Sequence, residues 1–464
     1  MNLLRLSIAY IRQQKLRTVL NVLLLSLGIA TIVILLLFSY QFEKNLNRNA
    51  AGIDVVVGAK GSPIQLILSS IFHMDAPTGN ISLKEAKNII ENRAVKSAIP
   101  LALGDNYRGF RIVGTTKEYA NHYQVSLKNG RFWRSNFEIV VGSDVFASEQ
   151  LSIGDDIISS HGLSSSGHAH SKKPLTVVGI LEESNTVMDR LILTGVPTVW
   201  AVHEHADEAD HVHESEGYDH ESEYHSHDDQ HGAHNHDEDH REEEYQKSRV
   251  ADGQISVPDN ESELQSESSN AHFAFMTDEN MDKELTSMLI TYASPIAAAM
   301  FPRYVNSETD MQAAAPGFEI ARLLNLLGIG LDALRIFGII LIFSAALGVF
   351  IALYNALEER QYDLAIMRTI GGTRTTLLTI VILEGLILSV AGCLLGFVIG
   401  HGAIALLGES FYQARQFDLT ALIIVPSEVG LLGLAIGIGI ISSLIPAVQA
   451  YRTDISAILS KGKM

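Results

Sequence analysis

The chain has 464 residues, of which 47% are hydrophobic, and a formal net charge of −19. Residues 201–270 contain 22 acidic and 3 basic residues, which accounts for the whole net charge and leaves the rest of the chain neutral. The acidic balance therefore describes one segment and not the fold. The single cysteine, Cys393, excludes a disulfide framework, so an exported domain must be stabilised by its own core.

Four apolar segments are long enough to cross a bilayer, since a helix needs roughly 20 residues to span about 30 Å of hydrocarbon. One lies near the N-terminus and three lie in the last third of the chain. Backbone groups in lipid must be hydrogen-bonded within their own segment, so each segment is expected to be a helix. The predicted transmembrane helices cover residues 19–42, 336–357, 377–407 and 429–448.

Basic residues near the first segment predict its orientation. Arg5, Arg12, Lys15 and Arg17 precede it without any acidic residue, which places the N-terminus in the cytoplasm. A cleaved signal peptide is the less favoured alternative, because the apolar run is too long and no small-residue cleavage site follows it. The expected divisions are a cytoplasmic N-terminus (1–18), a periplasmic domain (43–318), a stalk (319–335), a cytoplasmic coupling loop (358–376), a periplasmic loop (408–428) and a cytoplasmic C-terminus (449–464).

The block at 43–318 combines strand-like runs with a short helical pattern. Residues 112–115, 138–141 and 175–181 are short apolar β-type runs, and Ser82 with Glu85 forms a capping box ahead of a helix. The predicted fold class is an α+β membrane protein. It has four transmembrane helices in a 1+3 order, with a large mixed α/β periplasmic domain between the first and the second.

An insertion at 201–270 is rich in histidine and acid and has few apolar residues, so we expect it to be disordered. Eleven histidines lie within residues 203–240. Imidazole suits zinc and other transition metals, so the insertion predicts loose metal binding, with no cofactor bound for catalysis. A solvated acidic loop is the alternative, and no spacing singles out a fixed four-ligand site. The candidate ligands are His203, His205, His211, His213, His225, His227, His234 and His236, with His168 and His170 upstream.

Small residues repeat at four-residue spacing in the last two spans. They are Gly392, Gly396 and Gly400 in one span, and Gly433 and Gly437 in the other. Such spacing lets helix backbones approach closely, so it predicts helix packing, within one subunit or else along a dimer seam. Glu384, an ionisable residue near the start of a span, suggests function, whereas His401 is expected to be an interfacial residue.

The cytoplasmic loop and the start of the next span read ALEERQYDLAIMRTIGGTRTTLLTIVILEG over residues 356–385. With the 1+3 layout, this stretch resembles the permease subunits of the macrolide-exporter and FtsX-like ABC superfamily, the mechanotransmission (type VII) permeases, which includes LolC and LolE. Asp363 stands where the family carries Glu, and Ser456 stands where Pro is usual near the C-terminus. The matching residues are Glu359, Arg360, Leu364, Ala365, Ile366, Arg368, Ile370, Gly371, Gly372, Arg374, Glu384 and Gly385.

The resemblance implies that a short cytoplasmic helix docks on a separate ATPase subunit. The chain itself is not expected to be an enzyme, since Gly58–Ser62, its nearest approach to a Walker loop, has the wrong spacing. The expected partners are a cytoplasmic ABC ATPase, a second copy of the permease, and a periplasmic adaptor or metal-binding protein, with no nucleic acid. The residues expected to take part in ATPase coupling are Glu359, Arg360, Asp363, Arg368, Gly371, Gly372 and Arg374.

The predicted function is a multi-pass permease subunit of the bacterial inner membrane. It passes ATP-driven motion to a periplasmic domain that acts on cargo or a partner, with a possible link to zinc. Three alternatives stay open at this stage: an FtsX-like scaffold that controls a periplasmic hydrolase, a lipoprotein-releasing permease, and a metal receptor that uses its spans only as an anchor.

Overall fold

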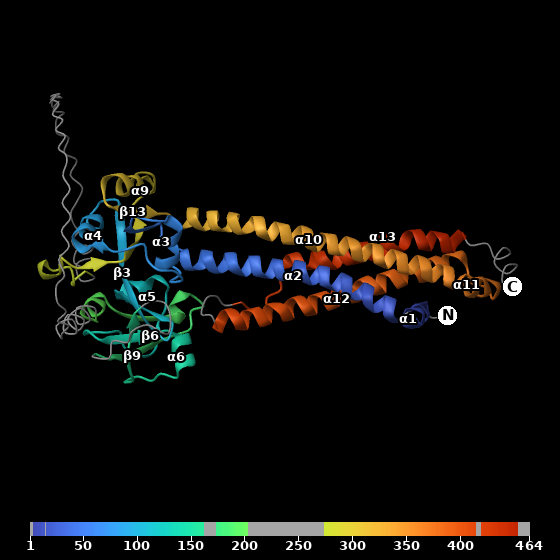
Figure 1. Ribbon diagram of the computed structural model, residues 1–464, viewed down its shortest axis with the longest axis horizontal. Coiled ribbons are helices and arrows are strands. Elements are labelled where there is room, and N and C mark those ends of the chain that lie inside the picture. Colours follow the sequence, from blue (N-terminus) through green and yellow to red (C-terminus); the bar gives the residue numbers. More distant parts are fainter. Residues whose placement is uncertain (1–2, 14, 162–172, 203–272, 414–418, 453–464) are drawn as a thin grey trace, which may run out of the picture.

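A computed structural model describes residues 3–13, 15–161, 173–202, 273–413 and 419–452. A long helical bundle carries a sheet domain at one end (Figure 1). Four of its helices are long and apolar enough to cross a membrane, and the mixed α/β domain lies between the first and the second of them, which confirms the predicted fold class. The bundle helices are α1 (Leu3–Gln13), α2 (Lys15–Ala50), α10 (Pro316–Glu359), α11 (Gln361–Thr369), α12 (Arg374–Gln413) and α13 (Pro426–Arg452).

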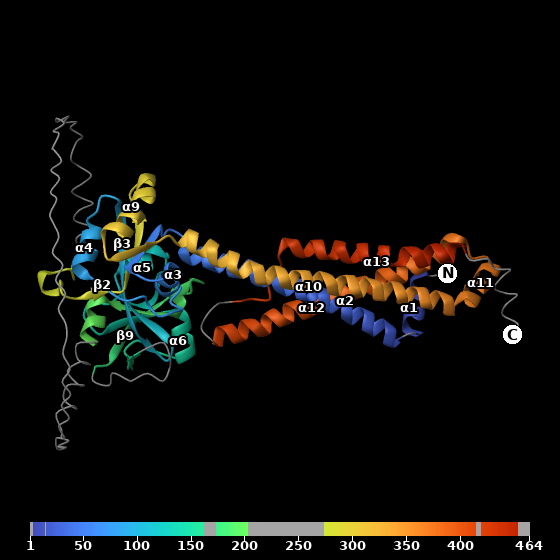
Figure 2. The ribbon, with the colours of Figure 1, turned by 45° about the horizontal axis from the view of Figure 1, so that its top comes forward.

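The bundle helices extend beyond the apolar runs that predict them. Helix α2 continues to Ala50, and α10 joins the residues expected to form a stalk and a span into one helix of 44 residues. Both helices enter the sheet domain, whereas α1 and α11 lie at the opposite end of the bundle (Figure 2). The long axis of the molecule therefore runs along two unbroken helices.

The sheet domain is built on one mixed sheet of eleven strands, in the order β13-β1-β12-β3-β4-β10-β6-β9-β5, with β7 on β9 and β8 on β3. Two parallel pairs, β4/β10 and β6/β9, lie among antiparallel neighbours. The strands are β1 (Val55–Ala59), β3 (Val95–Tyr107), β4 (Phe110–Thr115), β5 (Leu127–Gly130), β6 (Glu138–Val141), β7 (Asp156–Ile157), β8 (Ser160–His161), β9 (Leu175–Leu181), β10 (Leu191–Gly195), β12 (Ser287–Tyr292) and β13 (Met311–Ala314). A separate pair joins β2 (Ile81–Ser82) to β11 (Glu284–Leu285).

Strand β3 joins the two halves of the sheet. Its first half pairs with β12, from Val95 to Leu101, and its second half pairs with β4, from Ala102 to Tyr107. Short helices cover the sheet: α3 (Pro63–Ser70), α4 (Leu83–Ile90), α5 (Lys117–His122), α6 (Ser143–Glu149), η1 (Val187–Arg190), η2 (Asp278–Asn280) and α9 (Pro295–Glu308). Ser82 is the N-cap of α4, as the capping box predicts, although its side chain makes no capping hydrogen bond.

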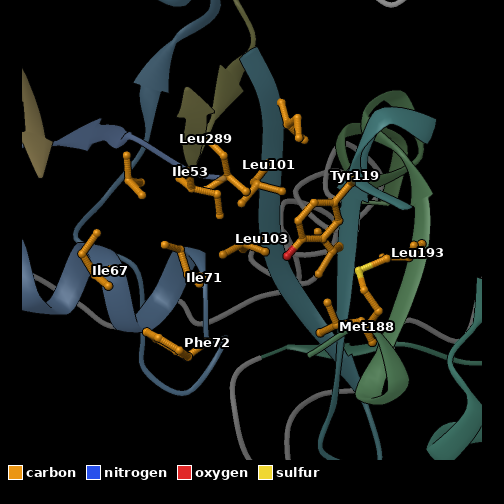
Figure 3. Close-up of a cluster of buried hydrophobic side chains, with 14 of the residues drawn as sticks. Ile53, Ile67, Ile71, Phe72, Leu101, Leu103, Tyr119, Met188, Leu193 and Leu289 are labelled. Carbon is orange, nitrogen blue, oxygen red and sulfur yellow. The ribbon is translucent and has the colours of Figure 1, made fainter. Parts of the chain in front are cut away.

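The largest core cluster lies where the bundle meets the sheet domain. It contains Leu46 from α2 and Ile320 from α10, packed with residues of the sheet and of α3 and α5. Figure 3 shows part of it, with Ile67 of α3 and Ile71 just after that helix on one side of β3, and Tyr119 and Met188 on the other. The ends of both long helices are thus built into the same apolar core.

Three glycines of α12 allow it to lie close along α2. A Cβ at Gly392, Gly396 or Gly400 would come within 3 Å of side-chain atoms of Leu25, Ile29 and Val33, respectively. At these three positions α12 lies close against α2 within one chain. 

Gly433 and Gly437 make no such close contact within the described chain. A Cβ at either position would meet no described atom within 4 Å. The contact between α12 and α13 instead runs through Gly439, whose Cβ would lie 3.0 Å from the carbonyl oxygen of Gly385. Gly433 and Gly437 face away from the rest of the described chain, so a dimer seam remains a prediction for them.

Candidate functional site

Helix α11 is a short helix that turns back against the bundle after α10. Leu364 and Ala365 are buried, and Leu364 packs with Leu377 and Val381 of α12 and with Ala447 of α13. The opposite face of α11 is therefore the one available to a partner.

The two glycines after α11 close the helix. The N–H of Gly372 donates to the carbonyl oxygen of Met367 (2.9 Å), and the N–H of Gly371 donates to that of Arg368 (3.1 Å). This is a Schellman C-cap, which needs a residue in the left-handed region, and Gly371 supplies it with φ of 107°. A Cβ on Gly372 would lie 2.8 Å from the Met367 carbonyl oxygen. Both glycines thus shape the turn into α12, and neither presents a side chain to a partner.

The outer face of α11 combines apolar side chains with a carboxylate. Tyr362, Ile366 and Ile370 recur every four residues and are 50%, 36% and 81% exposed, and Asp363 is exposed next to them. Exposed apolar side chains gathered on one face, with a charge among them, are typical of a protein-binding surface. This face, Tyr362, Asp363, Ile366 and Ile370, is called the docking face below.

Arg360 lies inside the bundle and not on the docking face. Its Nη1 atom is 3.0 Å from Glu384 Oε1, and Nη2 donates to the Tyr10 carbonyl oxygen at 3.0 Å. The guanidinium also lies over the Tyr10 ring, 4.2 Å from its centroid. The side chains of Arg360 and Glu384 are only 11% and 7% exposed, so the pair is a buried tie between α1, the α10–α11 junction and α12.

The other predicted coupling residues are placed around this tie. Glu359 pairs with Arg17 of α2 at 3.0 Å, and both side chains are half exposed. The Arg374 guanidinium lies 5.9 Å from the ring centroid of Tyr451 on α13. Arg368 is half buried. The structure therefore brings these residues to one end of the bundle, but only Asp363 lies on the outer face of α11.

Helix α1 is the part of this site that sequence reasoning missed. It packs on α12, where Ser7 donates to the Ile380 carbonyl oxygen at 3.4 Å, and it supplies Tyr10 to Arg360. Burial, and then the negative charge of Asp363, raise the pKa of Tyr10. The available signal was the pattern LLRLSIAYIRQ, in which Arg5 and Arg12 lie on one side of an otherwise apolar helix.

No group of three or more potential metal ligands occurs among the residues that the structure describes. The predicted ligands at 168, 170 and 203–236 lie outside those residues. Metal binding by the insertion therefore stays a prediction from composition.

Two stretches of the chain, which contain α11 and much of the sheet domain, match models of known protein domains. Residues 335–455, which include α11, α12 and α13, match the model of the FtsX-like permease C-terminal domain. Residues 18–213, which include α2 and much of the sheet domain, match the MacB-like periplasmic core domain. The chain thus combines one region that matches the FtsX-like permease C-terminal domain with another that matches the MacB-like periplasmic core domain.

Individual relatives are distant. The chain is 24% identical over 135 residues to the ABC transporter permease YtrF of Bacillus subtilis (strain 168), and the match spans 27% of this chain and 31% of YtrF. Among solved structures, the extracellular domain of the noncanonic ABC-type transporter YknZ from Gram-positive bacteria aligns over 56% of this chain and 98% of its own length. That alignment has 8% identity and a TM-score of 0.26, and these values are too low to establish a common fold.

Proposed function

We propose that the chain is the permease subunit of an ABC-type complex of the bacterial inner membrane. A separate cytoplasmic ATPase moves α11, and the motion passes through α10 and α2 to the sheet domain, which is periplasmic. The observation that carries this proposal is the continuous helix α10, which runs from its junction with α11 to the largest core of the sheet domain.

Helix α10 supplies the most direct connection. Its 44 residues correspond to about 66 Å at 1.5 Å per residue. One end leads into α11 through Arg360, and Ile320 at the other end is 3% exposed within the core. A close-packed core resists deformation, so a displaced helix carries its packed neighbours with it.

Helix α2 makes a second, hydrogen-bonded joint at Asn49. The Asn49 side-chain oxygen accepts from the N–H of Val187 at 3.0 Å, and its carbonyl oxygen accepts from the Tyr123 hydroxyl at 2.7 Å. Asn49 is buried, so these bonds are sheltered from water. They attach α2 to both η1 and α5 of the sheet domain.

The proposed orientation rests on the positive charges. Arg5, Arg12, Lys15 and Arg17 all lie in α1 or at the start of α2, at the same end as α11. Retention of basic residues on the cytoplasmic side puts this end, with the docking face, where an ATPase can reach it.

Charge and polarity changes on the docking face test the proposal. Asp363→Lys and Ile370→Asp are expected to abolish copurification of the ATPase and ATP-dependent activity, while the amount of protein inserted in the membrane stays unchanged. Asp278→Lys, an exposed charge reversal in the sheet domain, is the matched control. Normal copurification and activity with both docking-face variants would contradict the proposal.

A zinc link and a permease dimer are further parts of the proposal. The histidine-rich composition supports loose zinc binding, and the unfilled space beside Gly433 and Gly437 is compatible with a second copy of the chain. ATPase activity of the complex across a zinc titration, with and without residues 203–240, tests the first. Equal activity with both chains at every zinc concentration would remove the link.

A further inference from the structure

A short strap, residues 419–425, lies between α12 and α13 at the sheet-domain end of the bundle, and three side chains fasten it. Gln41 of α2 makes two hydrogen bonds to the backbone of Thr420, at 3.0 and 2.8 Å. His401 of α12 contacts the Ala421 carbonyl oxygen at 2.7 Å, and Glu428 of α13 accepts from the Val425 N–H at 3.2 Å. The strap is thus held at a defined position against three membrane helices.

His401 and Glu428 also contact each other, with 3.2 Å between Nε2 and Oε2. A carbonyl oxygen can only accept, so His401 Nδ1 carries a hydrogen toward Ala421. The Nε2–Oε2 contact then needs a second proton, either on the imidazole or on the carboxyl group. In either arrangement the pair has no net charge, which suits a site surrounded by apolar side chains.

Two adjoining cavities open on either side of the strap. The first, of about 660 Å³, lies between α2, the end of α12 and the strap. The second, of about 710 Å³, lies between α12, α13 and the strap, and its lining is apolar except for His401 and Glu428. Ala405, Ala421 and Leu422 line both cavities, so the two share a wall.

The first cavity is the more polar of the two, and its described lining carries an excess of positive charge. Lys44 and Arg48 line it together with the amides of Gln41 and Asn45, and Glu409 is the one acidic residue of its described lining. Arg48 donates through Nη2 to the Asn45 side chain, and its buried Nε has no hydrogen-bond partner among the described residues. Cations and amide groups at the end of a membrane helix match an anionic headgroup.

The second cavity is an open apolar groove. Val398, Leu422, Ile424 and Val429 line it and are 69% to 91% exposed in the chain. In a membrane protein such side chains face acyl chains, so the groove continues into the hydrocarbon of the bilayer. The polar cavity next to it lies at the level where α2 enters the sheet domain.

We propose that these two cavities form one binding site for an anionic phospholipid of the leaflet on the sheet-domain side. The phosphate lies against Lys44 and Arg48, and an acyl chain occupies the groove between α12 and α13. The juxtaposition of a cationic polar cavity with an apolar groove across a shared wall is the observation that supports it. The site does not depend on the ATPase.

The test is native mass spectrometry of the purified full chain with phosphatidylglycerol and with phosphatidylcholine of the same acyl chains. The intact chain is expected to bind phosphatidylglycerol at least fivefold more tightly. The double variant Lys44→Gln/Arg48→Gln is expected to lose that preference. The control Lys60→Gln/Arg335→Gln, which removes two positive charges elsewhere, is expected to retain it.

The groove is tested separately by Gly402→Leu, since Gly402 lines it and a Cβ there would meet no described atom within 4 Å. This variant is expected to weaken phosphatidylglycerol binding several-fold, whereas Gly330→Leu on α10, also in open space, should not. Equal binding of both lipids by the intact chain, an unchanged preference in the Lys44/Arg48 variant, unchanged binding by Gly402→Leu, or displacement of the lipid by inorganic phosphate alone would overturn the proposal.

Discussion

The Arg360 guanidinium ties three elements together at the α11 end of the bundle, through Glu384 of α12 and Tyr10 of α1. Removing one member of a buried ion pair leaves the other charge without compensation, which costs roughly 3–5 kcal/mol. Arg360→Gln is therefore expected to destabilise the chain by an amount in that range.

The double variant Arg360→Gln/Glu384→Gln distinguishes a coupled pair from two independent residues. It should be less destabilised than the sum of the two single variants, because neither charge is then left alone. Thermal unfolding of the purified chain measures both effects, and additive losses would show that the tie is not an energetic unit.

His73 in the sheet domain gives a prediction for pH. Burial, and then the charge of Arg111, lower the pKa of His73 to about 3, and its Nε2 lies 2.8 Å from the Tyr119 hydroxyl. The unfolded chain takes up a proton near pH 6.5 and the folded chain does not, so His73 makes folding less favourable as pH falls from about 6.5 to 3, by at most about 1.4 kcal/mol per pH unit.

His73→Gln retains a polar partner for Tyr119 and does not titrate. It is expected to make the loss of stability below pH 6.5 less steep. Tryptophan fluorescence follows this domain, because both tryptophans of the chain, Trp133 and Trp200, lie in it. An unchanged slope in the variant would exclude His73 as a source of the pH dependence.

At the scale of elements, the contact between α2 and α12 depends on the small residues of α12. A Cβ at Gly396 would lie 2.9 Å from the Cβ of Ile29, so Gly396→Leu must push the two helices apart. Such overpacking typically costs about 1–3 kcal/mol. Thermal unfolding should show this loss for Gly396→Leu and almost none for Gly328→Leu on α10, which faces open space. Equal losses in the two variants would mean that α12 does not pack on α2 as described.

Length and composition were sufficient to predict the four membrane helices, because a long apolar run has few alternatives to a membrane helix. They could not distinguish Gly433 from Gly439, since spacing reveals a small-residue face and not the neighbour that meets it. The orientation of the Arg360 side chain could not be predicted for the same reason. The charged motif is identical whether the guanidinium points outward or toward Glu384. Helix α1 was missed because its 11 residues are too short and too polar to span a membrane.

At the scale of the whole molecule, the helical bundle is a rod that joins two sites. The docking face lies at one end, and the core shared by Leu46 and Ile320 lies at the other. Because α10 is continuous between them, a break at one point within this helix should interrupt the transmission of motion along it. Gly330 lies in the first half of α10, and a Cβ at that position would meet no described atom within 4 Å.

The most direct measurement is hydrogen exchange of the sheet domain with and without ATP, in the complex with its ATPase, for the intact chain, Gly330→Pro and Gly330→Ala. Proline removes a helical hydrogen bond and kinks the helix, whereas alanine preserves it. Transmission along the helices predicts an ATP-dependent change at residues 46–53 and 316–324 in the intact chain and in Gly330→Ala. In Gly330→Pro the change at residues 316–324 should be lost while ATP hydrolysis continues. An equal ATP-dependent change in Gly330→Pro, or none in the intact chain, would contradict transmission through α10.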